Sequence, residues 1–341
     1  MRSLFKSNFP RESLACGILF ALTIGSSAAE TKLLNASYDV IREFYQEFNP
    51  LFAAYWKEKT GDTVIINQSH GGSSKQARAV IDGLEADVLT MNQSLDIDMV
   101  HERAGLLPAD WAERLPNHSV PFSSTIVFLV RKGNPAGIKD WDDLVRPGVS
   151  LIIPNPKTYG NGRYSYLAAW GYALEKWGGD HAKARDFVSR LFANVPILDT
   201  GGRGATTSFV QRGIGDVLLT FENEAALALK ESGGNKLEVI VPSLSVSAEN
   251  PVVWVDKVVA KHGTEQIARA YLEYLYSSPA QELAARHNFR PQNPAIFAKH
   301  ADHFQQLKLL SVDQIAGGWH KAQEAHFAEG ALFDQIYQPR K

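Results

Sequence analysis

The sequence of 341 residues is poor in cysteine: its single one, Cys16, excludes a fold held together by disulfide bonds. A chain without cross-links must be stabilised by its hydrophobic core. Hydrophobic residues make up 45% of this sequence, which at this length is enough for two domains with separate cores.

The sequence also has no excess of basic residues, no internal repeat, no low-complexity stretch and no long run of like charges. It has 35 lysines and arginines against 37 aspartates and glutamates, a formal net charge of −2. A mildly acidic chain lacks the electrostatic footprint of a nucleic-acid-binding protein. No segment after residue 30 approaches the roughly 20 apolar residues that a membrane-spanning helix needs, so we expect a soluble mature chain.

Residues 1–29 have the pattern of a secretory signal peptide. A basic start is followed by an apolar run over 14–24, too short to span a membrane, and by the small residues Ser27, Ala28 and Ala29. We expect cleavage near Ala29 and export to the periplasm. Because the apolar run continues past Cys16, a lipoprotein is disfavoured. Removal of Arg2, Lys6, Arg11 and Glu12, together +2, changes the formal net charge from −2 to −4.

Strand-like and helix-like segments alternate along the rest of the chain, the order typical of a parallel sheet covered by helices on both faces. Strands are expected at 32–36, 63–67, 87–90, 150–153 and 216–220, and long extended runs at 123–135 and 251–260. Helices are expected at 38–61, 75–84, 96–104, 164–177, 181–192, 208–211, 264–276 and 279–288.

This order predicts an α/β protein of two lobes joined by two extended crossovers. One lobe would comprise 30–118 and 251–341, and the other 119–250. A ligand site is expected in the cleft between them.

Three turns share a composition of glycine and hydroxyl residues: SHGGSSKQ from residue 69, PKTYGNGRY from residue 156 and DTGGRGATT from residue 199. Each precedes a predicted helix, so each exposes free backbone N–H groups at the positive end of a helix dipole. Glycine lets a ligand approach that backbone closely. Together they predict one anion site, with ordinary capping turns as the alternative. None matches the nucleotide-binding P-loop.

Catalytic and metal sites are less well supported. The HGG at His70 is superficially like an oxyanion-hole motif, but no GxSxG nucleophile elbow follows it. Two groups of residues could be written as metal ligands, but both are expected on solvated helix faces: His300 with His303, and Asp96 with Asp98 and His101. We therefore expect no catalytic residue, metal or cofactor, and we expect the aromatic residues of 166–177 to lie in the core.

Several long strings resemble the prokaryotic sulfate-binding proteins of ABC importers. They are LLNASYD, QSHGGSSKQ, STIVFLVRKGNP, PNPKTYGNGRYSYLAAWGYA, DTGGRGATTSFVQRGIGDVL and GGWHKAQEAHFAEGALFDQI, and they extend from Leu33 to Ile336. The resemblance implies the type II periplasmic binding protein fold, whose two lobes close on the ligand. It also implies a monomer that delivers sulfate or thiosulfate to a membrane permease.

The resemblance also implies site residues. Ser73 would bind through its backbone N–H and hydroxyl, and Gly160, Asn161 and Gly202 through backbone N–H groups. Four further residues would orient or neutralise these turns: Asp39, His70, Arg163 and Arg203. We expect Asp39 to be engaged by an arginine and not to act as an acceptor for the ligand.

Two positions depart from the sulfate-specific pattern. Tyr159 stands where those proteins place a serine, and Phe221 where they place a tryptophan that donates its indole N–H. Both are expected to line the anion site. Phe221 is similar to the thiosulfate-binding branch, and an aromatic face suits a large, weakly accepting sulfur atom. We therefore expect thiosulfate as well as sulfate; the alternatives are another tetrahedral oxyanion such as molybdate, or an extracytoplasmic ester hydrolase.

Overall fold

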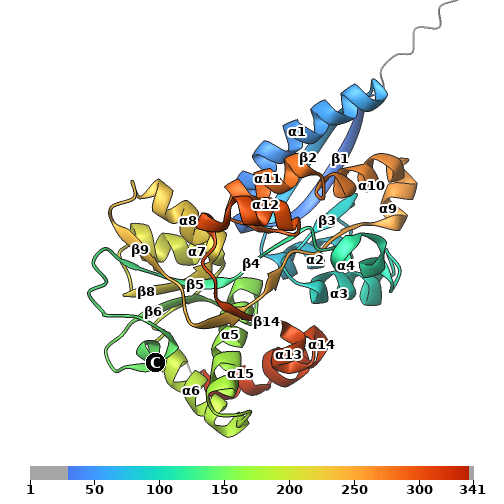
Figure 1. Ribbon diagram of the computed structural model, residues 1–341. Coiled ribbons are helices and arrows are strands. Elements are labelled where there is room, and N and C mark those ends of the chain that lie inside the picture. Colours follow the sequence, from blue (N-terminus) through green and yellow to red (C-terminus); the bar gives the residue numbers. More distant parts are fainter. Residues whose placement is uncertain (1–29, 338–341) are drawn as a thin grey trace, which may run out of the picture.

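The computed structural model describes residues 30–337, so the predicted signal peptide and Cys16 lie outside the described part. Two sheets organise the described chain (Figure 1). The first has the order β12-β3-β1-β2, from Val252–Trp254, Val88–Thr90, Glu30–Tyr38 and Thr63–Gly71. Strand β1 is parallel to both β2 and β3, whereas β12 runs antiparallel to β3.

Helices cover both faces of this first sheet, and we call the sheet and its helices the first lobe. On one face lie α1 (Arg42–Thr60), α10 (Glu265–Tyr274) and α11 (Ser278–Arg286). On the other lie α2 (Ser73–Ile81) and α3 (Ser94–Ala104). Adjacent strand residues alternate between the faces: Val88 packs in the core under α1, and Leu89 in the core under α2 and α3.

The second sheet, with its helices, forms the second lobe. Its order is β7-β6-β8-β5-β9, from Leu198–Asp199, Leu151–Pro154, Val217–Phe221, Ile126–Arg131 and Leu237–Ile240. Helices α5 (Gly160–Lys176) and α6 (His181–Ala193) lie on one face, and α7 (Gly202–Thr206) and α8 (Glu222–Glu231) on the other. Because both faces are covered, β5 is apolar at every position from Ile126 to Val130.

A small antiparallel sheet of three strands connects the lobes: β11 (Ala248–Glu249), β4 (Phe122–Ser124) and β13 (Arg290–Pro291). Within this sheet, the buried Arg290 of β13 forms a bidentate ion pair with Glu222, with N–O distances of 2.7 and 2.9 Å. Fork-to-carboxylate pairing fixes direction as well as distance, so it fastens β13 to the end of β8.

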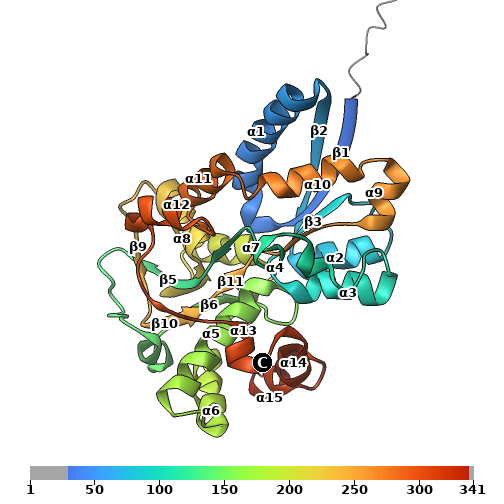
Figure 2. The same ribbon diagram turned by 45° about the vertical axis from the view of Figure 1, so that its right-hand side comes forward.

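The C-terminal part of the chain differs from the predicted division. Strand β14 (Lys308–Leu310) pairs with β10 (Leu244–Val246), and α13 (Val312–Ala316) and α15 (Leu332–Ile336) pack on α5 and α6. Figures 1 and 2 show these red elements beside the green helices of the second lobe. These C-terminal segments show no strong hydrophobic periodicity, because they are short and separated by turns.

The remaining elements are short. They are η1 (Asp39–Ile41), η2 (Trp111–Arg114), α4 (Pro116–Ser119), η3 (Trp141–Val145), η4 (Thr207–Gln211), α9 (Asp256–His262), α12 (Pro294–Lys299), η5 (Ala301–His303), α14 (Trp319–Ala322) and η6 (Gln323–Phe327). Within 30–337, no helix combines the length and the apolar character that crossing a membrane requires.

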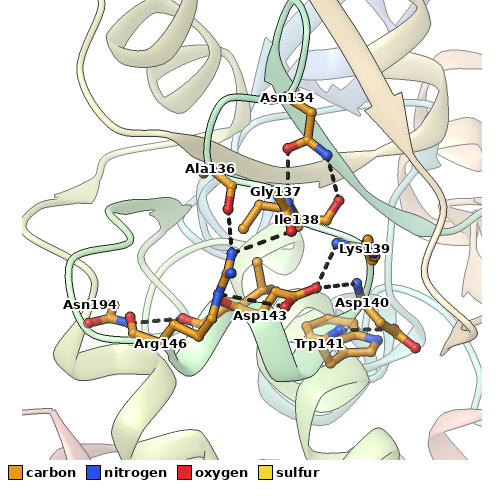
Figure 3. Close-up of polar contacts among 11 residues, drawn as sticks. Asn134, Ala136, Gly137, Ile138, Lys139, Asp140, Trp141, Asp143, Arg146 and Asn194 are labelled. Atoms are coloured by element: carbon orange, nitrogen blue, oxygen red, sulfur yellow. Dashed lines mark hydrogen bonds and ion pairs between the residues drawn. The ribbon is translucent and has the colours of Figure 1, made fainter.

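The loop between β5 and β6 is held by its own polar contacts (Figure 3). Asp140 and Asp143 form a capping box around the start of η3, and the Arg146 guanidinium donates to the backbone carbonyl of Ala136. Asn134 both donates to and accepts from the backbone of Ile138. Asn194, which follows α6, also donates to the backbone carbonyls of Leu144 and Arg146, so the loop is fastened to the second lobe.

The observed helices and strands correct two expectations. The extended run predicted at 251–260 ends at Trp254, and α9 begins at Asp256, an acidic residue suited to the positive end of a helix. The three glycine turns are also shorter than expected. Gly72 and Gly201 are N-cap residues, while Gly160 and Gly202 are the first helical residues, so α2, α5 and α7 begin at Ser73, Gly160 and Gly202. The two-lobed α/β class itself is confirmed.

The buried carboxylate of Asp87, directly before strand β3, predicts how the stability of the protein depends on pH. Asp87 accepts from the backbone N–H of Leu34 and the hydroxyl of Thr264, and lies 3.0 Å from Nδ1 of His262. Hydrogen bonding to Asp87 raises the pKa of His262 above its ordinary value. The stability from this contact should be complete below about pH 6.5, the unfolded pKa, and be lost as pH rises through the folded pKa.

Thermal unfolding of the wild type and of His262→Gln at several pH values tests this. The melting temperatures of the wild type and of His262→Gln should differ most near about pH 5.5 and should become equal near about pH 8.5. His303→Gln is the matched control, because the His303 ring contacts a backbone carbonyl instead of a carboxylate. A constant difference across this range would contradict the prediction.

Candidate functional site

Three helices begin at the interface of the lobes without a capping side chain. The N-cap residues of α2, α5 and α7 are Gly72, Tyr159 and Gly201, and none of them makes a side-chain hydrogen bond to its helix. The first backbone N–H groups of α2 and α5 are consequently left for another acceptor. At α7 the backbone N–H of Arg203 already interacts with the Asp39 carboxylate. One helix comes from the first lobe and two from the second.

These helix starts line one small cavity. All six predicted site residues lie in its wall: Ser73, Tyr159, Gly160, Asn161, Gly202 and Phe221. Asp39, Val40, Gly72 and Asn92 complete it. The space open to the centre of a water-sized sphere is only about 10 Å³, so both lobes are closed around room for one small guest. A larger groove, about 560 Å³, lies between α1, α8 and α11 and contains none of the six.

Two glycines in the wall permit contacts that any side chain would block. A Cβ atom at Gly72 would lie 2.2 Å from the Tyr159 ring, across the lobe interface. A Cβ atom at Gly160 would lie 2.2 Å from Oδ1 of Asn92, also across the interface. Closure of the lobes therefore depends on glycine at both positions.

Ser73 is held in a position to donate. It is 1% exposed, and its hydroxyl oxygen accepts from the backbone N–H of Asn92 at 3.3 Å. Its own O–H is directed to the thioether of Met91 at 3.5 Å, a weak acceptor that a better one would replace.

Asp39 is engaged by Arg203, chiefly through the main chain. Burial raises the pKa of the Asp39 carboxyl group, and backbone N–H groups, including those of Arg203 and Val40, together with the charge of Arg203, act in the opposite direction. The Arg203 guanidinium forms its ion pairs with Glu43 at 3.0 Å and with Glu224 at 3.3 Å. The arginine expected beside Asp39 is therefore present, but its guanidinium is directed to other carboxylates.

Arg203 joins the lobes. Glu43 lies on α1 of the first lobe, and Glu224 on α8 of the second. Glu224 is buried and also accepts from the Thr206 hydroxyl at 2.8 Å. Burial raises the pKa of Glu224 to about 7, even beside the guanidinium.

Arg163 and His70 lie behind the cavity wall. Arg163 is buried, donates to the backbone carbonyl of Pro156 at 3.0 Å, and has its pKa lowered by burial. Its charge acts on Asp96, whose pKa is raised by its own burial. Asp96 is fully buried, so the expectation that it lies on a solvated face was wrong. His70 is half-buried at the end of β2, and burial lowers its pKa.

Sequence reasoning missed Asn92, Gly72 and Val40. Asn92 is the second residue after the end of strand β3 at Thr90. Polar residues just after the carboxyl end of a parallel strand are where ligand contacts gather, so its position was a usable signal. Val40 carries no such signal, because its contact with Gly202 depends on how the lobes meet.

The similarity of this chain to known proteins agrees with this geometry. Residues 38–290 match the family model of bacterial extracellular solute-binding proteins. A thiosulfate-binding protein of Pseudomonas aeruginosa is 54% identical over 339 residues, which cover 99% of this chain and all of the relative. The chain belongs to the family of sulfate- and thiosulfate-binding proteins.

Two further relatives agree with this assignment. A sulfate-binding protein of Salmonella typhimurium is 54% identical over 323 residues, covering 94% of this chain and 98% of the relative. The solved structure of the sulfate-binding protein SubI from Mycobacterium tuberculosis is 33% identical with a TM-score of 0.79, covering 87% of this chain and all of SubI. The resemblance in the sequence is thereby confirmed, and with it the solute-binding protein fold.

The contact between Gly72 and Tyr159 gives a test of closure. In Gly72→Ala, the new methyl group would overlap the Tyr159 ring, so the lobes should fail to close fully unless that ring is displaced. Small-angle X-ray scattering in buffer containing sulfate, the anion named in two of these relatives, should show a larger radius of gyration than for the wild type.

Gly204→Ala is the matched control, since a Cβ atom there would meet its neighbours at 3.8 Å or more. Its scattering should equal that of the wild type. An unchanged radius for Gly72→Ala would mean that the Tyr159 ring does not limit closure.

Proposed function

We propose that this protein binds sulfate and thiosulfate in the periplasm and delivers them to the membrane permease of an ABC importer. The observation that carries the proposal is the cavity between the lobes, lined by helix starts whose backbone N–H groups are uncapped. The names of the full-length relatives, sulfate-binding and thiosulfate-binding, supply the anions.

The physical task is to remove a doubly charged anion from water. That is costly unless fixed donors replace the lost hydration. The backbone N–H groups of Ser73, Gly160, Asn161 and Gly202 would do so without a formal positive charge. The helix dipoles behind them favour negative charge at the same point.

The donors would also exclude hydrogen phosphate. Sulfate and thiosulfate carry no proton at neutral pH, whereas hydrogen phosphate carries one that needs an acceptor. Asp39 is the carboxylate in the wall, and backbone N–H groups already occupy it. A buried, unpaired O–H costs about 1–3 kcal/mol, which corresponds to about fivefold to 150-fold in affinity, with tenfold at about 1.4 kcal/mol.

We further propose that the protein is a monomer without catalytic activity. The Ser73 hydroxyl lines the cavity, accepts from the backbone N–H of Asn92 and lies near the buried Asp96, whose pKa is raised by burial and whose charge faces that of Arg163. No histidine lines the cavity with Ser73 in the described chain, so the pairing of nucleophile, base and orienting group that covalent catalysis requires is not seen there. Closure would present one combined surface of the two lobes to the permease.

Isothermal titration calorimetry of the chain without residues 1–29 tests the function. Sulfate and thiosulfate should each bind with one site per chain and should displace one another, because they share the same donors. Phosphate should bind at least about tenfold more weakly. Sulfate binding without competition by thiosulfate would remove thiosulfate from the proposal, and phosphate affinity within a few-fold of sulfate would contradict the donor argument.

Phe221 provides a test of selectivity. Its ring is 2% exposed, packs against Tyr164 with the ring centres 5.8 Å apart, and offers the cavity no donor. Phe221→Trp adds an indole N–H, which suits oxygen better than sulfur. The ratio of sulfate to thiosulfate affinity should rise about tenfold, the effect of one hydrogen bond to a charged group.

Phe221→Leu is the control for this change, since it alters the shape without adding a donor. It should not raise the ratio. An equal rise in both variants would mean that volume, and not hydrogen bonding, sets the preference.

A further inference from the structure

Asn92 is a cavity residue that the resemblance did not assign to the anion site. It follows β3 in the first lobe, is 5% exposed, and lines the cavity with the predicted residues. Its backbone is fixed, because its N–H donates to the Ser73 hydroxyl. Its side chain is thus held between the starts of α2 and α5.

The Asn92 carboxamide is short of partners. Its Oδ1 is fully buried and accepts no hydrogen bond, and neither end of the amide is bonded to any residue in the range 30–337. Oδ1 lies against Gly160, at the point that a Cβ atom there would overlap. The amide therefore keeps two N–H groups with no acceptor in the described chain. Buried polar groups are rarely left in this state unless a water or a ligand completes them.

We propose that Asn92 is an additional anion-contacting residue, whose side-chain N–H donates to the bound sulfate or thiosulfate from the first lobe. This inference rests on the proposed function. It also accounts for a deficit in the site, because Tyr159 and Phe221 stand where sulfate-specific relatives supply a hydroxyl and an indole N–H. The Asn92 side-chain N–H supplies one hydrogen-bond donor in their place, from the segment that follows β3.

The position of Asn92 gives the contact a second consequence. The amide touches Gly160 of the second lobe, whose own N–H is one of the proposed donors. An anion that binds Asn92 and Gly160 together is held by both lobes, so the contact favours the closed form.

The experiment compares Asn92→Ala with the wild type by isothermal titration calorimetry. Alanine keeps the backbone N–H that holds Ser73 and removes only the amide. The affinities for thiosulfate and sulfate should each fall about tenfold to a hundredfold, the effect of one hydrogen bond to a charged group. Asn92→Asp, of nearly the same shape, should bind both dianions more weakly than the alanine variant, because it turns a carboxylate toward them.

Gln93→Ala is the matched control. Gln93 is the neighbouring amide, is fully buried and donates to the Ser74 hydroxyl, but does not line the cavity. Its removal should leave both affinities within about threefold of the wild type, well below the effect of one hydrogen bond to a charged group.

A measurement on the wild type makes the test independent of how the variants fold. In ¹H–¹⁵N spectra, the side-chain N–H₂ signals of Asn92, identified by their loss in Asn92→Asp, should shift when thiosulfate is added. Wild-type affinity in both Asn92 variants, or signals that stay in place at saturation, would overturn the inference. Failure of the wild type to bind either anion would instead overturn the proposed function.

Discussion

On the proposed function, neutral backbone donors from both lobes serve one enclosed cavity, and the rest of the structure depends on that constraint. A helix start is useful to an anion only while its N–H groups are free. Here the residues before α2, α5 and α7 cap nothing, so the dipoles and the donors remain available together. On the proposed function, the missing caps cost the empty protein some helix stability, and the anion restores it.

The same constraint explains why glycine gathers at the site. Donors from different lobes can reach one small guest only if the lobes come very close, and Gly72 and Gly160 allow ring and amide contacts across the interface. The charged residues stand one layer back. Arg203 ties α7 to α1 through Glu43, and Arg163 balances the buried Asp96 without reaching the cavity. Apart from Asp39, whose carboxylate is occupied by backbone N–H groups, the residues that line the cavity are uncharged.

Much of the fold could be predicted from the sequence because its signals are local. The continuous apolar run of β5, the helical spacing of α1 and the glycine after it depend on neighbours within a few residues. The three glycine turns also led to the cavity wall, since helix starts have a recognisable composition. These features carry enough information without knowledge of the tertiary structure.

The rest depended on contacts between distant parts of the chain. At Asp256 the one local signal for a helix start, its acidic side chain, is followed by the apolar Val258 and Val259, which also suit a buried strand. The partners of Arg203 and the role of Asn92 are set by the meeting of the lobes. The C-terminal segment was placed in the first lobe because its short elements have no periodicity that shows which sheet they rejoin.

The three strands between the lobes have a mechanical consequence. With β4 paired to β11 on one side and to β13 on the other, the chain passes between the lobes three times in a narrow ribbon. On the proposed function, the lobes pivot about this ribbon when they open. Because its strands stay hydrogen-bonded, the lobes return to the same arrangement, and contacts as tight as those of Gly72 and Gly160 form again.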